Sequence, residues 1–579
     1  MTRVAHDTGA GSSRRGWSYY LPGLWSLRHY DKRWLRGDVL AGLAVAAYLV
    51  PQVMAYAEVA QLPAIRGLWA ITASLVVYAV LGSSKELSVG PESTTALMTA
   101  AALGSLAAGQ PGRWPLVAAT LAVATGLVCL AARLVRLGFL SDLLSKPVLT
   151  GYMCGIGILM IISQLGKITG IDVPSGSVLE ELIFTVRHLD QLHVPTVVIS
   201  AIVVAVLLAI HRWWPKVPGT LVIMVVAASA VALIGQQRLG VAVVGSVPRG
   251  LPPPALPSLD GIPIGDLLLA ATGIAVVGFS DNMLTARAFA RHHGDKVDGS
   301  QELAALGAAN IAAGLVQGFP VSSSGSRTAI AHATGARSQL SSLVAAALVV
   351  LVLLVLAPAL ATFPLAALGG VVVYAATRLV DISGLRGLAA FRRSELILAL
   401  ATTVAVLAVD VLRGIAIAIG LSILDLLWRI GRPHDGVLGF VPGLAGMHDV
   451  DDYSNAKQIP GLVIYRYDSP LFFANAGNFL QRALGAVELG DQPVRWFLLN
   501  AEANIELDST SVDALEDLRI TLAQRGIQLA LARVKFEVAR TLIKAGFLDR
   551  IGPDRVFATL PTAVAAYRRW VEDQPGPTR

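Results

Sequence analysis

Two weakly apolar segments contain the residues best suited to chemistry. They cover roughly residues 88–106 and 322–335, and both are rich in Ser, Thr and Gly. Ser93–Leu97 reads S-T-T-A-L and matches Ser326–Ile330, which reads S-R-T-A-I. Each motif follows a short extended stretch, so the sequence predicts two discontinuous helices that meet within an inverted repeat. The alternative is that these small residues only let helices pack closely.

The chemistry that such a pair suits is anion binding. A helix start presents unpaired N–H groups and about half a positive charge, so two facing starts give about one unit. Arg327 adds a full charge that does not titrate away, and the resulting total of about two positive units matches a dianion such as sulfate. The expected substrate-binding side chains at the two starts are Ser93, Thr94, Ser326, Arg327 and Thr328.

Two acidic residues are candidates for ion coupling. Glu92 precedes the first motif and, if ionised, opposes a dianion, whereas Asp281 lies toward the cytoplasmic half of a later apolar segment. Because intramembrane carboxyl groups commonly relay protons, either residue is a candidate proton-coupling group. The alternatives are that Glu92 is a partner of the helix N-terminus and that Asp281 forms an ion pair with Arg287 or Arg327.

The composition predicts that these segments lie in a membrane. Of 579 residues, 54% are hydrophobic and only 15% are charged, with a mean hydropathy of +0.63. A soluble protein of this length carries about a quarter charged residues. The sequence pI of 9.4 does not indicate nucleic acid, because the basic residues lie in short clusters between apolar runs. That distribution is typical of cytoplasmic loops.

Apolar stretches of spanning length recur up to about residue 430. They cover roughly 39–57, 67–81, 115–137, 147–165, 195–213, 218–235, 264–280, 300–318, 339–358, 364–380, 395–411 and 413–428. With the two discontinuous segments, the pattern predicts an α-helical membrane protein of about fourteen spans, in which broken helices 3 and 10 occupy equivalent places in a seven-plus-seven inverted repeat. We assign residues 38–430 to this transmembrane domain.

The loop charges support this count. Loops after even-numbered helices carry most of the basic residues: Lys85, Arg133, Arg136, Lys146, Arg212, Lys216, Arg287, Arg291, Lys296, Arg337, Arg378, Arg386, Arg392, Arg393, Arg429 and Arg432. The opposite loops carry fewer: Arg66, Arg113, Lys167, Arg187, Arg238, Arg249 and Arg413. The positive-inside rule therefore predicts cytoplasmic N- and C-termini in a multi-pass protein of the inner (plasma) membrane. Residues 1–37 are basic and lack the features of a signal peptide, so we expect a cytoplasmic segment.

The pattern changes after Arg432. Residues 431–461 are rich in Gly, Pro and Asp and predict a linker. Residues 462–572 alternate short strands with amphipathic helices, which predicts a small α/β domain. Its expected strands cover 462–466, 495–500 and 527–532, and its expected helices cover 475–484, 509–525, 536–545 and 561–570.

Several motifs together resemble the sulfate permease (SulP) family of anion transporters. Residues 38–43 read D-V-L-A-G-L and residues 50–57 read V-P-Q-V-M-A-Y-A, which resembles the first helix of that family. Residues 82–91, G-S-S-K-E-L-S-V-G-P, resemble its approach to the third helix, and residues 318–328 resemble its tenth-helix motif. The resemblance covers nearly the whole chain, from about residue 20 to 570, and the tail resembles a STAS domain.

The resemblance implies an elevator-type transporter. Core helices 1–4 and 8–11 are expected to move against gate helices 5–7 and 12–14. The resemblance adds Gln52 and Tyr56 to the anion site. Asp281 falls where relatives place a carboxylate or a sodium-site aspartate followed by Thr285, so the motif leaves proton and sodium coupling open. Animal relatives have an aromatic residue at the Glu92 position, which favours a coupling role for Glu92 over direct anion contact.

The resemblance also concerns the tail and the partners. Asp508-Ser509-Thr510 matches a loop that carries a phosphorylatable serine in STAS antagonists, but the usual glycine after that serine is missing, which favours plain helix capping. Sulfate is the expected substrate, with bicarbonate or dicarboxylate as alternatives. We expect membrane lipid and a second copy of the chain, in a homodimer, as partners.

Other classes of function fit the sequence less well. A receptor with a STAS output is a further alternative, although it needs no conducting pathway. We expect no enzymatic activity, cofactor or metal, because the tail lacks a Cys/His or carboxylate cluster.

Overall fold

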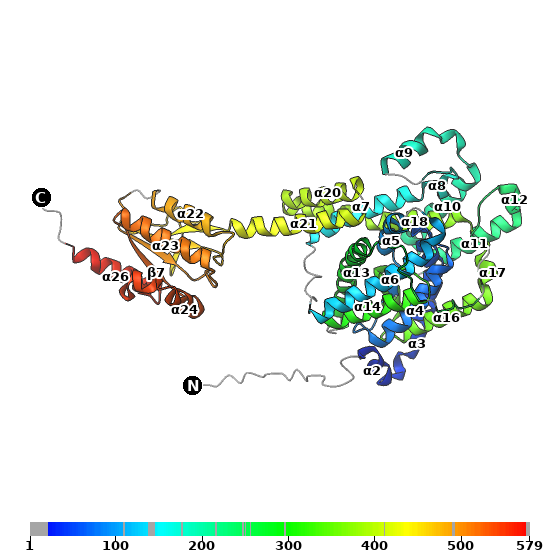
Figure 1. Ribbon diagram of the computed structural model, residues 1–579, viewed down its shortest axis with the longest axis horizontal. Helices are drawn as coiled ribbons and strands as arrows, with labels where there is room; N and C mark the ends of the chain where they lie inside the picture. The colour runs from blue at the N-terminus through cyan, green and yellow to red at the C-terminus, as the bar shows by residue number, and fades with distance from the viewer. Residues whose placement is uncertain are drawn as a thin grey trace. The chain divides into compact units, whose positions relative to one another are not determined.

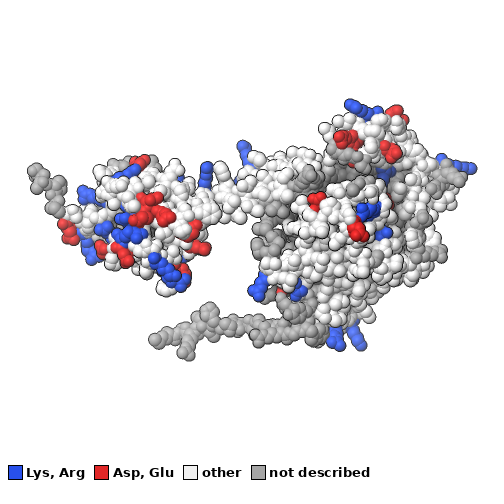
Figure 2. Space-filling view, in the orientation of Figure 1, with Lys and Arg blue, Asp and Glu red and all other residues white. Residues whose placement is uncertain are grey.

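The computed structural model describes residues 21–107, 110–136, 145–174, 178–214, 217–245, 248, 250–254, 256–293, 297–409, 411–488 and 492–574. Residues 1–20 of the expected N-terminal segment, together with Lys216, Arg249 and Lys296, lie outside this part of the chain. The chain forms two compact units, Met1–Ser422 and Ile423–Arg579 (Figure 1). Figure 2 shows charged residues spread over the visible surface of the second unit, whereas that of the first is mostly uncharged.

The first unit is helical, and each predicted span contains a helix. These helices are α3 (Leu35–Val59), α4 (Ile65–Leu81), α5 (Ser93–Leu106), α6 (Trp114–Leu134), α7 (Lys146–Ser163), α10 (Val194–Trp213), α11 (Gly219–Ile234), α13 (Ile264–His293), α14 (Gly299–Leu315), α15 (Gly325–Thr334), α16 (Leu340–Leu351), α18 (Leu365–Leu379), α20 (Arg393–Ala408) and α21 (Val411–Gly431). A π-helical turn, Val352–Leu356, joins α16 to α17 (Ala357–Leu360). Shorter helices lie between them: α2 (Pro22–Arg28), α8 (Leu165–Thr169), α9 (Val178–Arg187), α12 (Gln236–Leu239) and α19 (Ile382–Phe391).

Seven helical stretches of the described residues are long and apolar enough to cross a membrane. They are Lys32–Val59, Pro111–Leu134, Lys146–Ser163, Val194–Trp213, Ile264–Ala290, Leu340–Leu360 and Leu365–Phe391. Two shorter apolar helices, Ile65–Leu81 and Gly219–Ile234, add to these. Several other helices are short or contain buried polar residues, and the count of fourteen spans stays a prediction.

The helices of the first unit form two packing groups that meet along α3. In one group, α14 packs against α4 and α6, α13 against α5 and α6, and α15 and α16 against α3. In the other, α7 packs against α18 and α20, and α10 against α11 and α18. Close contact between α6 and α14 depends on glycine, since a Cβ at Gly126 would overlap the carbonyl oxygen of Gly307. Small residues at such contacts let helix backbones approach within a membrane.

The second unit is a six-stranded sheet with helices on both faces. The strands are β3 (Asp435–Phe440), β4 (Met447–Asp449), β5 (Leu462–Tyr467), β6 (Trp496–Asn500), β7 (Gln528–Ala532) and β8 (Val556–Phe557), in the order β4-β3-β5-β6-β7-β8. Strands β5 to β8 are parallel, and β3 is antiparallel to both of its neighbours. The helices are α22 (Ala476–Glu488), α23 (Ser509–Gln524), α24 (Phe536–Lys544), α25 (Phe547–Ile551) and α26 (Leu560–Glu572).

The strand pattern explains the two helical layers. In β6, Phe497 and Leu499 pack in a core with α22, α23, α24 and α25, whereas Trp496 and Leu498 pack in a second core with α26. Side chains alternate between the two faces of a strand, and both faces here are covered. The predicted α/β domain is confirmed, with element bounds close to those expected.

Residues 431–461, which we expected to be a linker, instead contain strands of this sheet. Strand β3 pairs with β5, with Asp435 opposite Tyr467 and Val437 opposite Tyr465. One of the glycines that suggest a loop is required by close packing, since a Cβ at Gly436 would overlap the buried side chain of Asp449. Composition alone therefore misplaced the start of the α/β domain.

Candidate functional site

Two short strands bring the discontinuous helices together. Strand β1 (Val89–Gly90) pairs antiparallel with β2 (Ser322–Ser323), and each is followed at once by a helix, α5 or α15. Two further bonds join the segments: Ser324 N–H donates to the carbonyl oxygen of Ser88 at 2.9 Å, and Ser88 N–H donates to Thr328 Oγ1 at 3.1 Å. The predicted pair of broken helices therefore meets, and both helix starts lie at one place in the first unit.

Glu92 caps the start of α5. Its Oε2 accepts a hydrogen bond from Thr94 N–H at 2.7 Å, and its Oε1 accepts one from the Ser93 hydroxyl. Ser93 and Thr94 are buried, and Glu92 is half-buried. A carboxylate at this position satisfies an N–H group and interacts favourably with the helix dipole. The interpretation of Glu92 as a partner of the helix N-terminus is therefore confirmed. Its carboxylate accepts the hydrogen bond from Thr94 N–H that a bound anion would otherwise accept.

Ser324 caps the start of α15. Its Oγ accepts from Arg327 N–H at 3.5 Å and lies 3.2 Å from Ser326 Oγ. Ser326 is exposed, whereas Thr328 is fully buried and its hydroxyl donates to the carbonyl oxygen of Ser324 at 2.8 Å. Of the two predicted hydroxyls, Ser326 can meet a ligand, while Thr328 is used to join α15 to Ser88.

Arg327 is completely buried and its side chain turns toward β1. Nε donates to Ser88 Oγ at 3.2 Å, and Nη1 donates to the Pro91 carbonyl oxygen at 2.9 Å and to Gln52 Oε1 at 3.2 Å. Nη2 is buried without a hydrogen-bond partner among the described residues. Arg327 therefore holds the β1 segment in place and supplies a positive charge beside it, with both N–H donors of Nη2 unused.

Helix α3 provides an aligned row of polar side chains. Gln52 Nε2 donates to Tyr56 OH at 3.1 Å and to Tyr48 OH at 3.3 Å. Tyr56 also interacts with Ser93, and Tyr48 interacts with Ser326. The structure thus places the predicted Gln52 and Tyr56 between the two helix starts. It adds Tyr48, which sequence reasoning missed although positions 48, 52 and 56 share one helix face.

Helix α13 provides the other predicted ion-coupling residues. Ser323 Oγ donates to Asp281 Oδ2 at 3.3 Å. Thr285 lies beside the first residue of α15, since a Cβ at Gly325 would be 4.0 Å from Thr285 Oγ1. Every predicted site residue therefore lies on one of four segments that meet here: α3, the starts of α5 and α15, and α13. What each residue does stays a prediction.

A buried carboxylate that the sequence reasoning missed holds the approach to β1. Glu302 on α14 is fully buried and accepts hydrogen bonds from Tyr78 OH at 2.8 Å and Asn282 Nδ2 at 2.7 Å. It also accepts from the backbone N–H and hydroxyl of Ser83, at 2.9 and 2.7 Å. The sequence alone could have pointed to Glu302, because acidic residues within membrane segments are rare and have partners. Here the donors indicate a structural role.

The Asp508-Ser509-Thr510 loop of the α/β domain forms a helix cap. Asp508 accepts from Ser511 N–H at 2.8 Å and from Phe473 N–H at 2.7 Å, in a capping box at the start of α23. Burial opposes ionisation, but these hydrogen bonds hold the pKa of Asp508 below its usual value. The predicted capping by Asp508 is confirmed, and Ser509 is exposed.

The arrangement can bind a small anion and offers little to a metal. Within the described ranges, no group of three His, Cys, Asp or Glu side chains could hold a metal ion. The converging groups are instead N–H donors, hydroxyls, an amide and a guanidinium, with Glu92 and Asp281 at the edge. The first unit thus has paired half-helices, and an α/β domain follows it in the chain. Paired half-helices of this kind are typical of inverted-repeat membrane transporters.

Comparisons with known proteins agree with this class. The family model of the sulfate permease family matches residues 35–402, and that of the STAS domain matches residues 453–563. The chain belongs to the sulfate permease family, and it is a multi-pass membrane protein of an anion transporter family with a C-terminal STAS domain.

Similar sequences and folds extend over most of the chain. A probable sulfate transporter of Mycobacterium tuberculosis is 54% identical over 554 residues, covering 96% of this chain and 98% of that protein. The murine solute carrier 26 family member A9 anion transporter, in an inward-facing state, has a TM-score of 0.87 at 23% identity, covering 98% of this chain and 97% of that one. The transmembrane domain of a cyanobacterial bicarbonate transporter has a TM-score of 0.59, also at 23% identity, and covers 68% of this chain and 98% of its own.

Proposed function

We propose that the protein is a secondary active transporter of sulfate, and not an enzyme. The carrying observation is the meeting of the α5 and α15 starts beside the buried guanidinium of Arg327. Two helix dipoles and one arginine give about two positive units, which balance a divalent anion. The relatedness to probable sulfate transporters over almost the full chain supports sulfate as that anion.

We propose that substrate contacts come from groups that remain available in this arrangement. Ser326 is exposed beside Tyr48, and the first N–H groups of α15 lie next to it. Ser93, Thr94 and Tyr56 contribute from the α5 side, where all three are buried and Tyr56 interacts with Ser93. Arg327 and Gln52 then act as a charged support behind β1, because Gln52 accepts from Arg327 Nη1.

We propose that transport is coupled to protons through Glu92. The ionised carboxylate and a dianion compete for Thr94 N–H and repel each other, so the dianion binds best when Glu92 is protonated. Reciprocal linkage then makes sulfate favour proton binding to the same extent. Asp281 is the second candidate for this role, and sodium held near Asp281 and Thr285 is the alternative coupling ion.

The movement we propose is an elevator, with helices 1–4 and 8–11 as the moving core. The two packing groups of the first unit support this division, because they meet along α3. The protein would work in the inner (plasma) membrane as a homodimer with both termini in the cytoplasm, in keeping with the loop charges.

The test is uptake of radiolabelled sulfate into proteoliposomes that contain the purified protein. We expect uptake to accelerate with an inward proton gradient and to resist competition by bicarbonate or dicarboxylates. If uptake requires sodium instead, sodium rather than the proton is the coupling ion. If bicarbonate or a dicarboxylate competes more strongly than unlabelled sulfate, that anion is the substrate. If the protein binds sulfate without uptake, it is a receptor rather than a transporter.

A further inference from the structure

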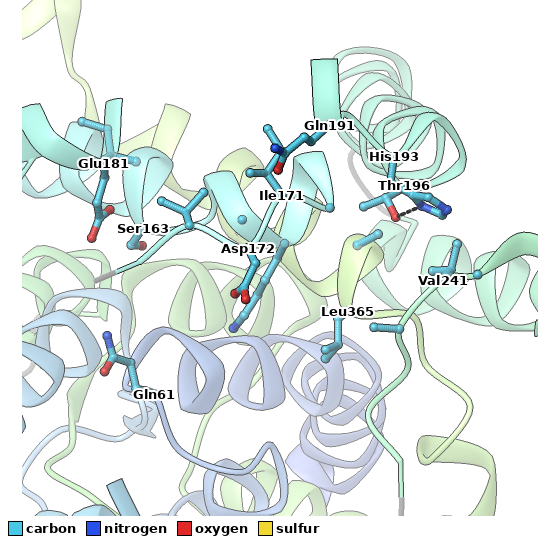
Figure 3. A pocket seen from close by; sticks show the side chains of 18 residues that line it. Gln61, Ser163, Ile171, Asp172, Glu181, Gln191, His193, Thr196, Val241 and Leu365 are labelled. Carbon is cyan, nitrogen blue, oxygen red and sulfur yellow. Dashed lines mark hydrogen bonds between the residues drawn. The ribbon is translucent and has the colours of Figure 1, made fainter. Parts of the chain in front are cut away.

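A polar cavity of about 620 Å³ lies near the C-terminal end of α3, away from the candidate site. Its walls come from the turn after α3, the end of α7, α8, α9, the start of α10, residues 240–242 and the start of α18. Figure 3 shows Gln61 on one side of the cavity, opposite Ser163 and Asp172, with His193 joined to Thr196 by a hydrogen bond. The volume lies in the range of small-molecule sites.

The cavity lies on the outer side in the predicted topology. Helix α3 starts on the cytoplasmic side, so the turn that contains Gln61 is outer. The end of α7, with Lys167 just beyond it, is outer by the same count of alternating spans. The cavity therefore lies at the face from which an anion would enter the cell.

The structure is closed between this cavity and the candidate site. Along α3, Val53, Met54, Ala55 and Ala57 are all 0% exposed. On the other side of Gln52, toward the N-terminus of α3, Tyr48 is half-buried, and its partner Ser326 is exposed. The site is thus accessible from the predicted cytoplasmic side and sealed from the outer cavity, by a stretch of helix about 9 Å long.

An ion pair lies where the seal meets the cavity. Lys167 Nζ, on α8, lies 2.9 Å from Glu58 Oε2 and donates to the Glu58 carbonyl oxygen at 3.2 Å. The two side chains are only 25% and 18% exposed. Glu58 belongs to α3, in the expected moving core, whereas Lys167 lines the cavity from the expected gate. The pair therefore joins the two groups of helices on the outer side, and outward opening has to separate it.

We propose that the cavity is the outer vestibule of the anion pathway and that the Glu58–Lys167 ion pair is the gate at its inner end. This inference rests on the proposed transport function. A dianion entering the vestibule is a stronger partner for Lys167 than the single carboxylate of Glu58. It therefore competes for the ammonium group, weakens the pair and favours the outward-open state. Asp172 and Glu181 also line the cavity, so its wall carries acidic as well as basic side chains.

The experiment measures how fast the sealed stretch becomes accessible from outside. Ala55→Cys, in a background with Cys129→Ser and Cys154→Ser, is labelled in right-side-out vesicles with a membrane-impermeant maleimide. We expect Glu58→Gln and Lys167→Gln to accelerate labelling without sulfate by up to about fivefold, in keeping with loss of a partly exposed ion pair. The double exchange Glu58→Lys with Lys167→Glu restores the pair and should return labelling to the slow rate. Gln191→Ala, on the cavity wall, is the matched control and should label at the slow rate.

Addition of sulfate tests whether the anion opens the gate by competing for Lys167. We expect external sulfate to accelerate labelling in the wild type and in Gln191→Ala, and to have no effect in Glu58→Gln or Lys167→Gln, where no ion pair remains. Unchanged labelling in both single variants, or fast labelling in the double exchange, would overturn the proposal. Equilibrium sulfate binding to each purified protein tests the central site separately. If the wild type does not bind sulfate, the transport proposal fails, whereas the labelling rates without sulfate still decide whether this pair closes the outer side.

Discussion

The starts of α5 and α15 have matching sequences and paired strands, yet their caps differ in charge. At α5, the carboxylate of Glu92 accepts from Thr94 N–H at 2.7 Å, so the terminus carries its own anion. At α15, the neutral hydroxyl of Ser324 accepts from Arg327 N–H at a long 3.5 Å, and a buried guanidinium adds a positive charge. One terminus is neutralised internally, and the other is left positive.

The two helix starts share their backbone geometry, and single side chains make their charges different. The helix dipoles alone would make the two starts equivalent anion sites. The α5 side carries the carboxyl group to which we assign proton coupling, Glu92, whereas Arg327 gives the α15 side a charge that does not titrate. We therefore expect loss of the Arg327 charge to lower affinity strongly at every pH, and loss of the Glu92 charge to change the pH dependence of affinity.

The largest effect is expected for Arg327→Gln. Removing a full charge near a dianion costs several kcal/mol at an effective dielectric constant of about 20, so sulfate affinity should fall by more than about 100-fold. Calorimetric titration of the purified protein with sulfate measures this, and thermal unfolding reports whether the variant is folded.

Two control variants separate charge from positioning at Arg327. Arg327→Lys keeps the charge but not the forked donors, and its affinity should lie between those of the wild type and Arg327→Gln. Ser88→Ala removes the acceptor of the 3.2 Å bond from Arg327 Nε and keeps the charge, so it should bind sulfate nearly normally. A loss in Ser88→Ala as large as that in Arg327→Gln would mean that Arg327 acts by holding β1 rather than by its charge.

An intermediate effect is expected for Glu92→Gln. The amide oxygen can still accept from Thr94 N–H, but the negative charge is gone, so affinity at neutral pH should rise by about tenfold, equivalent to about 1.4 kcal/mol. The proposed coupling predicts that affinity of the wild type falls as pH rises, because ionised Glu92 opposes the dianion. Glu92→Gln should bind sulfate with nearly the same affinity at every pH, which calorimetric titration at several pH values measures.

Asp281→Asn is the matched control for the proton role. It removes a second nearby carboxyl group that accepts from Ser323 rather than from the α5 start. A normal pH profile in Glu92→Gln together with a flat one in Asp281→Asn would transfer the coupling role to Asp281.

The smallest effect is expected for Ser324→Ala. Loss of a serine cap costs about 1 kcal/mol, and here the accepted bond is long, so sulfate affinity should fall by no more than about fivefold at any pH. The same titration measures it beside Arg327→Gln. If Ser324→Ala abolishes binding, the Ser324 hydroxyl contacts the anion directly, and the difference between the two starts does not lie in the charges of Glu92 and Arg327 alone.

Much of the fold followed from local pattern. Long apolar stretches predicted the helices, and two Ser- and Thr-rich interruptions predicted the half-helices, because an unpaired backbone is tolerated in a membrane only where protein surrounds it. The α/β tail followed from the alternation of strands and helices. The start of that tail did not, because Gly436 and its neighbours look like a loop until Asp449 and β5 are placed beside them.

The sequence by itself determined the membrane character, the places of the two broken helices and the candidate residues, since each depends on hydropathy or on spacing along a single segment. Only the tertiary structure decided how those residues are used. Arg327 turned out to hold β1 through Ser88 and Pro91 and to bond Gln52 on α3, and Glu92 to cap α5. The reason is that hydrogen-bond partners more than 200 positions apart, such as Ser88 and Arg327, are set by packing. A one-dimensional pattern shows which groups need partners in a buried site, but not which partners they find.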